Sequence, residues 1–435
     1  MKRLLFILLL AFNAADAAQP IQSWQLTNGA RVLFVENHAI PIIDISISFD
    51  AGARRDPQGK SGVAAMTRDM LARGVAASSG EPALNEAQIS DAFADTAAQL
   101  GGSAGSDRTN MTLRTLSSQR ERDEAILLAA RLLAQPAFPD AVLAREKIRT
   151  VAAINESDTK PASIASKAFM RAMYGTHPYS QKPTVATVET ITRDDLLAFY
   201  RAYYLADHAV IAIIGDVTRA QADAIAQQLT QRLPRVTSAL PTLPEIAVTQ
   251  AREERIKHPA SQSHILIGMP ALQRGDPDYF ALTVGNYILG GGGFVSRLME
   301  EVREKRGLSY SVGSGFHARK QQGPFQISLQ TKKAQTDEAL KITRETLAAF
   351  LRDGPTESEL KAAKDNMIGG FALHIDTSKK MLDNLAVIGF YGLPLDYMET
   401  WKANVAKVSK EDVRAAFRRK LAVEKMVTVI VGAPE

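Results

Sequence analysis

The sequence predicts an α+β fold of two homologous sandwich units in tandem, each an antiparallel-rich sheet with helices on one face. The runs 209–215 and 426–432 are both rich in β-branched residues, end in glycine and lie 217 residues apart, which indicates an internal duplication. Within each half, strand-like alternation comes first and helical periodicity follows. This segregation of strands and helices along the chain favours α+β units over alternating βαβ units.

Individual elements follow from local patterns. Strands are expected at 31–35, at 42–49, where Ile43, Ile45 and Ile47 share one face, and at 109–116. Helices are expected at 92–100 and from Asp123 onward, and a charged helix is expected from Ser296 to a stop at Gly307. The tripeptide Asp-Glu-Ala at 123–125 recurs at 337–339, and each copy precedes a proline-marked break, as a duplicated unit would.

These patterns divide the chain into four segments. The expected boundaries are a signal peptide at 1–17, a first unit at 18–235, a proline-marked linker at 236–250 and a second unit at 251–435.

Composition excludes several classes of protein. The 435 residues are 46% hydrophobic and 23% charged, which is typical of a globular chain, and the absence of cysteine excludes disulfide scaffolds, thiol nucleophiles and cysteine-ligated metals. The formal net charge is only +5, and the basic residues are scattered. Nucleic-acid binding, which needs a basic stripe, is therefore not expected.

The N-terminus has the pattern of an export signal. Lys2 and Arg3 precede nine apolar residues at 4–12 and the small-x-small triplet Ala15-Asp16-Ala17. Nine residues cannot cross a bilayer core, which needs about 20, so a membrane anchor is not expected. We expect cleavage after Ala17 and a periplasmic location for the mature chain.

Local catalytic motifs are weak. No two of the seven histidines are closer than six residues, so neither His-Glu-x-x-His nor its inverse occurs, and His177 and His208 are expected to be structural. The segment 101–105 matches the Gly-x-Ser-x-Gly nucleophile elbow, but a helix is expected before it and a strand after it, the reverse of the order that this device requires. A hinge or loop is expected at four consecutive glycines: Gly290, Gly291, Gly292 and Gly293.

Longer segments carry a family resemblance over essentially the whole mature chain. The run 289–310, which includes Gly-Gly-Gly-Gly-Phe-Val-Ser-Arg and Arg-Glu-Lys-Arg-Gly-Leu-Ser-Tyr, resembles the pitrilysin, insulysin and mitochondrial processing peptidase family of inverted-motif zinc peptidases. The segments 214–217, 376–377 and 391–397 agree with it. The resemblance implies repeated α+β units that form half of a clam-like chamber for short, unfolded peptides.

The zinc-binding positions of that family are degenerate here. Where the family carries His-x-x-Glu-His, this chain has Ala65, Arg68 and Asp69, and the third-ligand position, 77 residues beyond Asp69, is Glu146. Arginine stays protonated and cannot act as the general base. We therefore expect no metal bound by this chain, and an ion pair between Glu146 and Arg145 or Lys147.

A second functional element of the family is intact. Relatives use an arginine and a tyrosine, seven residues apart in the unit that lacks zinc, to contact substrate near the scissile carbonyl, and the matching residues are Arg303 and Tyr310. Both side chains can donate hydrogen bonds to a developing oxyanion. The alternative is a buried salt bridge and a core tyrosine.

The resemblance implies the non-zinc subunit of a two-chain periplasmic zinc metallopeptidase. The zinc would be held by a homologous, zinc-motif-bearing partner, and the chain would be inactive alone. The main alternative is a catalytically dead peptide-binding or scaffold protein, which could form a homodimer. A metal-independent hydrolase has no positive feature in the sequence.

Overall fold

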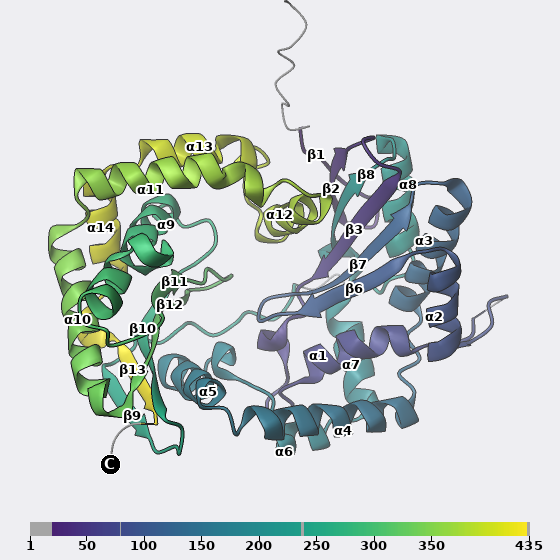
Figure 1. Ribbon diagram of the computed structural model, residues 1–435. Helices are drawn as coiled ribbons and strands as arrows, with labels where there is room; N and C mark the ends of the chain where they lie inside the picture. The colour runs from purple at the N-terminus through teal and green to yellow at the C-terminus, as the bar shows by residue number, and fades with distance from the viewer. Residues whose placement is uncertain (1–19, 79, 236–238, 433–435) are drawn as a thin grey trace, which may run out of the picture.

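The computed structural model describes residues 20–78, 80–235 and 239–432, which fold into two α+β units (Figure 1). The expected signal peptide and its cleavage site lie outside the described residues. No described helix is long and apolar enough to cross a membrane.

The first unit is built on a six-stranded sheet with the order β1-β2-β8-β3-β7-β6. Its strands are β1 (Gln22–Gln25), β2 (Arg31–Glu36), β3 (Ile42–Phe49), β6 (Gln99–Ala104), β7 (Thr109–Leu116) and β8 (Val210–Gly215). A separate short pair is formed by β4 (Gly74–Val75) and β5 (Leu84–Asn85). Strand β2 runs parallel to β8, whereas the other neighbouring pairs are antiparallel.

The second unit repeats this topology with five strands in the order β11-β12-β10-β13-β9. Its strands are β9 (Arg252–Ile256), β10 (Gln262–Leu272), β11 (Val312–Phe316), β12 (Gly323–Lys332) and β13 (Val427–Val431). The parallel pair recurs, because Arg252 of β9 lies opposite Val427 of β13 as Arg31 of β2 lies opposite Val210 of β8. The two homologous α+β units predicted from the sequence are therefore confirmed, and β1 is an addition to the first.

The helices of the two units follow a similar plan. Those in the first half are α1 (Val63–Met70), α2 (Glu86–Asp95), α3 (Gln119–Ala134), α4 (Asp140–Ser157), α5 (Pro161–Tyr174), α6 (Val185–Glu189), α7 (Arg193–Tyr203) and α8 (Arg219–Thr230). Those in the second half are α9 (Tyr279–Asn286), α10 (Thr336–Asp353), α11 (Glu357–Gly370), α12 (Ser378–Tyr391), α13 (Tyr397–Lys407) and α14 (Lys410–Lys420). Each unit packs most of its own helices over one face of its sheet, where its largest apolar core forms.

The opposite face of each sheet is covered by one helix from the other half of the chain. Helix α12 packs on β2, β3 and β8, and α5 packs on β10 and β13 (Figure 1). At Gly389 of α12, an added Cβ would lie 2.6 Å from the Leu33 side chain, so the absent side chain permits the close approach of helix and sheet. This reciprocal exchange joins the two units through shared apolar cores.

Because α12 covers the second face of the first sheet, strand β3 is buried on both faces, which its sequence pattern alone does not predict. Ile43, Ile45 and Ile47 of β3 share one buried face, as expected, but the alternating polar residues between them are buried too. Asp44 remains satisfied there because it accepts two hydrogen bonds from Arg114, at 2.7 and 2.9 Å.

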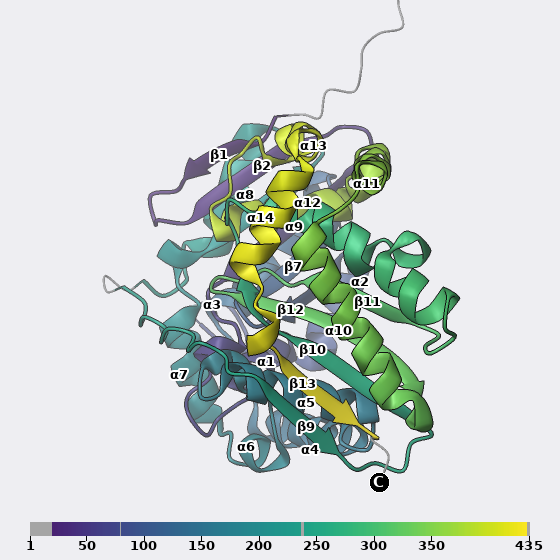
Figure 2. The ribbon, with the colours of Figure 1, turned by 90° about the vertical axis from the view of Figure 1, so that its left-hand side faces the viewer.

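The two parallel strand pairs, β2–β8 and β9–β13, differ on the face that lies away from the exchanged helix. In the first unit, Val32 and Phe34 of β2 join the apolar core, and α8 packs nearby. In the second unit no described helix takes the place of α8, and β9 is visible from outside (Figure 2). Its residues at the corresponding positions are charged: Glu253 pairs with Arg344 of α10 at 3.0 Å, and Arg255 pairs with Asp337 at 2.7 Å.

Helix α2 differs from expectation, whereas strand β7 agrees with it. The helix expected at 92–100 ends at Asp95, because the chain turns back at Thr96 and enters β6 at Gln99. The elbow-like segment at 101–105 therefore begins inside a strand, and Ser103 bonds Asn110 of β7 rather than a histidine. Strand β7 has the expected bounds, and residues 239–251 form no helix or strand.

Candidate functional site

The degenerate zinc positions lie on helix α1, which a buried aspartate holds at its start. Asp56 accepts hydrogen bonds from the backbone N–H groups of Gly62 and Ala64, at 2.8 and 2.7 Å. Burial raises the pKa of Asp56 to about 6, although these two bonds oppose the shift. The helix is therefore placed precisely enough to present a site, but its side chains decide what that site can bind.

Those side chains are unsuited to zinc. Ala65 has no ligand atom, and the Arg68 guanidinium donates a 2.8 Å hydrogen bond to Asp69. Arg68 also reaches the edge strand β6, where its Nη2 lies 3.0 Å from the position that a Cβ on Gly102 would take. A protonated guanidinium therefore occupies the place where the family pattern has its general base.

Glu146 is held by arginines. It lies on α4 and is only 9% exposed, with a carboxylate oxygen 2.8 Å from Arg145, 3.4 Å from Arg149 and 4.0 Å from Arg73. The expected ion pair with Arg145 is present, but the group is buried rather than on the surface. Lys147 turns away and donates to the carbonyl oxygens of Glu189 and Ile191.

A second carboxylate completes this network. Glu86 pairs with Arg145 at 2.8 Å and also with Arg73, and the hydrogen bond from Arg145 is the largest cause that lowers the pKa of Glu86. Around Glu146, cationic partners thus replace the metal that the family resemblance would place there. Among the described residues, no three histidine, aspartate or glutamate side chains gather so as to hold a metal ion. The residues present do not fit zinc.

The glycine-rich segment, Gly290 to Gly293, begins inside one stretch of π-helix and is followed by another. Residues Tyr287–Gly291 and Met299–Glu304 have π-helical hydrogen bonding, and Gly293–Val295 forms a 3-10 turn between them. At Gly290, an added Cβ would lie 2.5 Å from Ser314 Oγ, so the segment can pack against β11 only with glycine there. π-Helical turns are rare and frequently occur at functional sites.

Arg303 and Tyr310 are on this glycine-rich side of the second unit, and neither is a core residue. The Arg303 guanidinium lies over the ring of Phe294, 4.7 Å from its centroid, and 3.4 Å from Glu304. Tyr310 is 77% exposed, which excludes the core-tyrosine alternative. Both side chains can therefore reach a ligand in solvent, and a guanidinium with a phenol can stabilise a developing oxyanion.

The degenerate zinc positions and the Arg303–Tyr310 pair belong to different units. Within the described parts of the chain, no hydrogen bond or ion pair links the two groups. The structure thus separates residues that do not fit zinc from two accessible hydrogen-bond donors.

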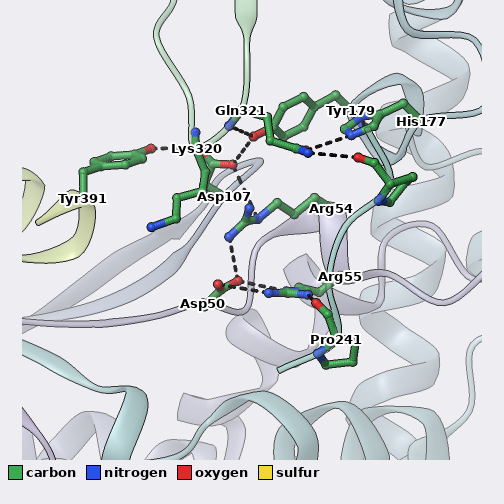
Figure 3. Close-up of polar contacts among 11 residues, drawn as sticks. Asp50, Arg54, Arg55, Asp107, His177, Tyr179, Pro241, Lys320, Gln321 and Tyr391 are labelled. Carbon is green, nitrogen blue, oxygen red and sulfur yellow. Dashed lines mark hydrogen bonds and ion pairs between the residues drawn. The ribbon is translucent and has the colours of Figure 1, made fainter. Parts of the chain in front are cut away.

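A third cluster, which the sequence analysis missed, lies where the two units meet (Figure 3). Asp107, in the turn between β6 and β7, accepts hydrogen bonds from the hydroxyls of Tyr179 and Tyr391, at 2.6 and 2.8 Å, and from the backbone N–H of Lys320 at 2.9 Å. Arg54 lies 3.5 Å away, and its side chain is 2% exposed. The carboxylate therefore joins segments that are far apart in the sequence.

The groups around Asp107 have perturbed proton affinities. Burial is the largest cause that raises the pKa of Tyr179 above its usual range and that raises the pKa of Tyr391 to about 12. Burial also lowers the pKa of His177, which accepts from the Tyr179 N–H at Nδ1 and meets Gln321 Oε1 at 2.9 Å through Nε2. The expectation that His177 is structural fits this position. No sequence signal marks Asp107, which reads as an ordinary turn residue.

Comparison with known proteins agrees with the fold and with the degenerate site. Residues 31–186 match the family described as insulinase (peptidase family M16), and residues 190–367 match the family described as peptidase M16 inactive domain. A solved structure described as a peptidase M16 inactive domain, from Pseudomonas fluorescens, is 37% identical, with a TM-score of 0.89 over 95% of this chain and 98% of that one.

Curated relatives carry different descriptions. A Helicobacter pylori protein named non-peptidase homolog YmxG is 23% identical over 99% of both chains. A Streptomyces coelicolor protein named an uncharacterized zinc protease is 30% identical, over 64% of this chain and 62% of its own length.

Together, the tandem sandwich units and the degenerate zinc positions define a member of the inverted-motif zinc peptidase class whose described residues do not fit zinc. The chain belongs to peptidase family M16.

Proposed function

We propose that this chain is the non-zinc subunit of a heterodimeric periplasmic zinc metallopeptidase. A homologous partner that carries the intact zinc motif would supply the metal, and this chain would supply Arg303 and Tyr310 to a shared chamber for short, unfolded peptides. The chain by itself would be inactive. The periplasmic location rests on the export-signal pattern of residues 1–17.

One observation carries the proposal: the chain has lost the groups that bind zinc but keeps an accessible donor pair. At the degenerate site, Arg68 is paired with Asp69, and Glu146 is engaged by arginines. By contrast, Tyr310 is 77% exposed, and Arg303 is stacked on Phe294 with only a 3.4 Å contact to Glu304. An exposed phenol beside a glycine-rich loop is hard to explain by stability, because it buries little apolar surface.

The chemistry of the pair suits a carbonyl that gains negative charge. In the tetrahedral intermediate of peptide hydrolysis, the carbonyl oxygen becomes an oxyanion, and donors aimed at it lower the barrier. The guanidinium and the phenol of this chain could donate to that oxygen, and a zinc motif in the other chain would supply the hydrolytic chemistry. The exposed edge strand β6 offers backbone groups for an extended peptide, which would pair by strand addition.

The first experiment is to purify the tagged mature chain from its native cells and identify what accompanies it. A homologous zinc-motif chain in a one-to-one ratio supports the two-chain enzyme. Recovery of this chain alone, as a monomer or homodimer, contradicts it.

The second experiment tests the donor pair in the assembled complex. Arg303→Ala and Tyr310→Phe should each lower kcat by about 100-fold, the size expected when one oxyanion donor is removed, without preventing assembly. Lys305→Ala is a matched control, because Lys305 is a neighbouring exposed cation that pairs with Glu300 and Glu301. Unchanged turnover in both variants would remove the assigned role.

A second candidate is a peptide-binding or scaffold protein without any catalytic partner, which could form a homodimer in solution. The relative named as a non-peptidase homologue, which aligns over 99% of both chains, favours it. Under this candidate the chain alone binds peptides, and no zinc-dependent hydrolysis accompanies it from its native cells.

A further inference from the structure

Two arginines from different units lie close together at the junction near Asp107. Arg108 follows Asp107 in the turn between β6 and β7, and Arg274 lies in the loop after β10. Their guanidinium carbons lie over consecutive rings at the end of α12, 5.6 Å from the centroid of Phe390 and 5.4 Å from that of Tyr391, and the two ring centroids are 5.0 Å apart. Burial lowers the pKa of Arg108, and the nearby charge of Arg274 acts in the same direction.

The acidic groups near this pair are already engaged. Asp107 is 3% exposed in its side chain and is held by Tyr179, Tyr391 and the backbone N–H of Lys320. Asp383 of α12 pairs with Lys379 at 2.9 Å. Within the described residues, neither Arg108 nor Arg274 forms an ion pair.

Hydrogen-bond donors are also left over. Arg274 Nε and Arg319 Nη1 are buried and have no acceptor. The two residues are neighbours, because the backbone N–H of Arg274 donates to the carbonyl of Arg319 at 2.7 Å. The one side-chain hydrogen bond of Arg108 among the described residues is a long contact, 3.4 Å, to Ser48 Oγ. Buried unpaired donors are uncommon, and each points to a missing partner such as an ion, a water or a ligand.

We propose that Arg108 and Arg274 form a binding site for a carboxylate of a peptide. A guanidinium that lies over an aromatic ring can still present in-plane N–H groups to a bidentate carboxylate. A carboxylate beside both cations would add to the attraction that Asp383 and Asp107 already exert on Arg108, and would further offset the repulsion from Arg274. Because one arginine comes from each unit, the site exists only in the assembled fold.

The inference rests on the proposed function in one respect: the ligand is a peptide because the chain is proposed to handle peptides. It adds a substrate class, namely peptides with acidic groups. The carboxylate could belong to an Asp or Glu side chain or to the peptide C-terminus, and both present the same two oxygens.

The test measures peptide binding to the isolated full mature chain, without a partner subunit. The probes are a fluorescent unfolded peptide rich in Asp and Glu, the same peptide with Asn and Gln instead, and C-terminally amidated forms of both. The acidic peptide should bind at least about tenfold more tightly than its neutral counterpart, since charge-assisted bonds to arginine are stronger than neutral ones. Loss of binding on amidation alone would identify the C-terminal carboxylate as the source.

Substitutions locate the binding. Arg108→Gln and Arg274→Gln should each weaken binding of the acidic peptide at least about tenfold. Arg108→Lys should weaken this binding less, because lysine keeps the charge but not the planar guanidinium group. Arg418→Gln is the matched control, an exposed arginine on α14 with the same charge change. The thermal midpoint of the free glutamine variants should not fall, because each removes one of two repelling cations.

Several results would overturn the site. Equal binding of acidic and neutral peptides would do so, as would folded glutamine variants that bind as the wild type does, or no peptide binding by the isolated chain. Competition by inorganic phosphate without any peptide effect would identify an adventitious ion only. None of these results bears on whether a zinc-motif partner co-purifies, so failure of the site and failure of the proposed function are distinguishable.

Discussion

Asp107 and Tyr391 are 284 residues apart in the chain, and the Tyr391 hydroxyl donates a 2.8 Å hydrogen bond to the Asp107 carboxylate. One residue lies in a strand turn of the first unit and the other at the end of the helix that the second unit lends to the first sheet. The same carboxylate also accepts from Tyr179 and from the backbone of the β11–β12 connection (Figure 3). The buried Asp107 carboxylate thus joins the two units by hydrogen bonds at the point where their apolar cores meet.

Asp107→Asn should strongly destabilise the chain. Asparagine has the shape of aspartate but lacks the charge beside Arg54. Its amide NH2 would replace one carboxylate oxygen, so a hydrogen-bond donor would face another donor. Arg54 would keep its closer ion pair with Asp50, at 2.8 Å, but each buried donor that loses its acceptor costs about 1 to 3 kcal/mol. Urea unfolding at neutral pH measures the loss.

Asp123→Asn is the control, since Asp123 is an exposed residue on α3 whose pair with Arg122 is on the surface. It should change the free energy of unfolding by less than about 1 kcal/mol. A similar small change for Asp107→Asn would show that the cluster does not fasten the units.

Much of the fold was predictable because local sequence patterns indicate its strands and helices, and several of these patterns occur in both halves of the chain. The strand with Ile43, Ile45 and Ile47 has the predicted bounds, and so has the strand at 109–116. An alternation over eight residues is typical of a strand and does not fit a helix. The duplication was visible in the two glycine-ended strands, β8 and β13, which hold the same place in their sheets.

The helix exchange was not predictable from such patterns. Helices α5 and α12 have ordinary amphipathic sequences, and nothing local shows that each packs on the sheet of the other unit. The early end of α2 at Asp95 was missed for a similar reason: the glycines at 101 and 102 weaken the strand signal of β6, which forms because it pairs with β7.

The residues of the candidate site likewise divide into those that local motifs predict and those that only tertiary contacts bring together. Ala65, Arg68 and Asp69 follow from motif positions along one helix, and so do Arg303 and Tyr310 along one segment. The Glu146–Arg145 pair also follows from positions along one helix, but Arg73 reaches Glu146 from another element, and Asp107 has partners from distant parts of the chain. Contacts of this kind depend on tertiary structure, and a single sequence does not encode them locally.

His177 should make stability fall as the solution becomes acidic. Its Nδ1 accepts from the Tyr179 N–H and its Nε2 meets Gln321 Oε1, so the neutral ring with a proton on Nε2 satisfies both contacts. Because burial lowers the folded-state pKa of His177 below 6.5, the unfolded chain binds the proton more readily. The stability from this group is present above about pH 6.5 and is lost as the pH falls toward the folded-state pKa.

His177→Gln should therefore be less stable than the wild type at pH 7.5, and the difference should shrink as the pH falls to 5. Urea unfolding of both proteins across this range measures it. A constant difference would mean that His177 does not titrate with folding.

His38 should show the opposite trend. Its hydrogen bond to Asp216, at 2.5 Å, is the largest cause that raises its pKa, and a bond to Glu36 at 2.8 Å adds to it. A raised pKa means that the folded state holds the proton more tightly, so this contribution is present below pH 6.5 and disappears as the pH rises through the folded-state pKa. The His38→Gln difference from the wild type should accordingly grow from pH 7.5 to pH 5, and a difference that shrinks would contradict the assignment.

Restoring the zinc motif alone should not restore a zinc site. The triple variant Ala65→His, Arg68→Glu and Asp69→His supplies the missing motif residues, but the third position, Glu146, remains paired with Arg145 and Arg149 and near Arg73. A metal would have to displace these cations and would then lie beside their positive charge. We expect the triple variant to retain less than one zinc ion per chain after dialysis, as measured by elemental analysis.

The matched variant adds Arg73→Gln and Arg145→Gln to the triple variant, which frees the Glu146 carboxylate from two of its three arginines. It should bind zinc at least about tenfold more tightly than the triple variant, because two histidines and a carboxylate form a complete catalytic-type ligand set. Circular dichroism and thermal unfolding establish that both variants fold. Equal zinc binding by the two would mean that the arginine network does not keep Glu146 from a metal, and that loss of the two histidines by itself explains why this chain lacks one.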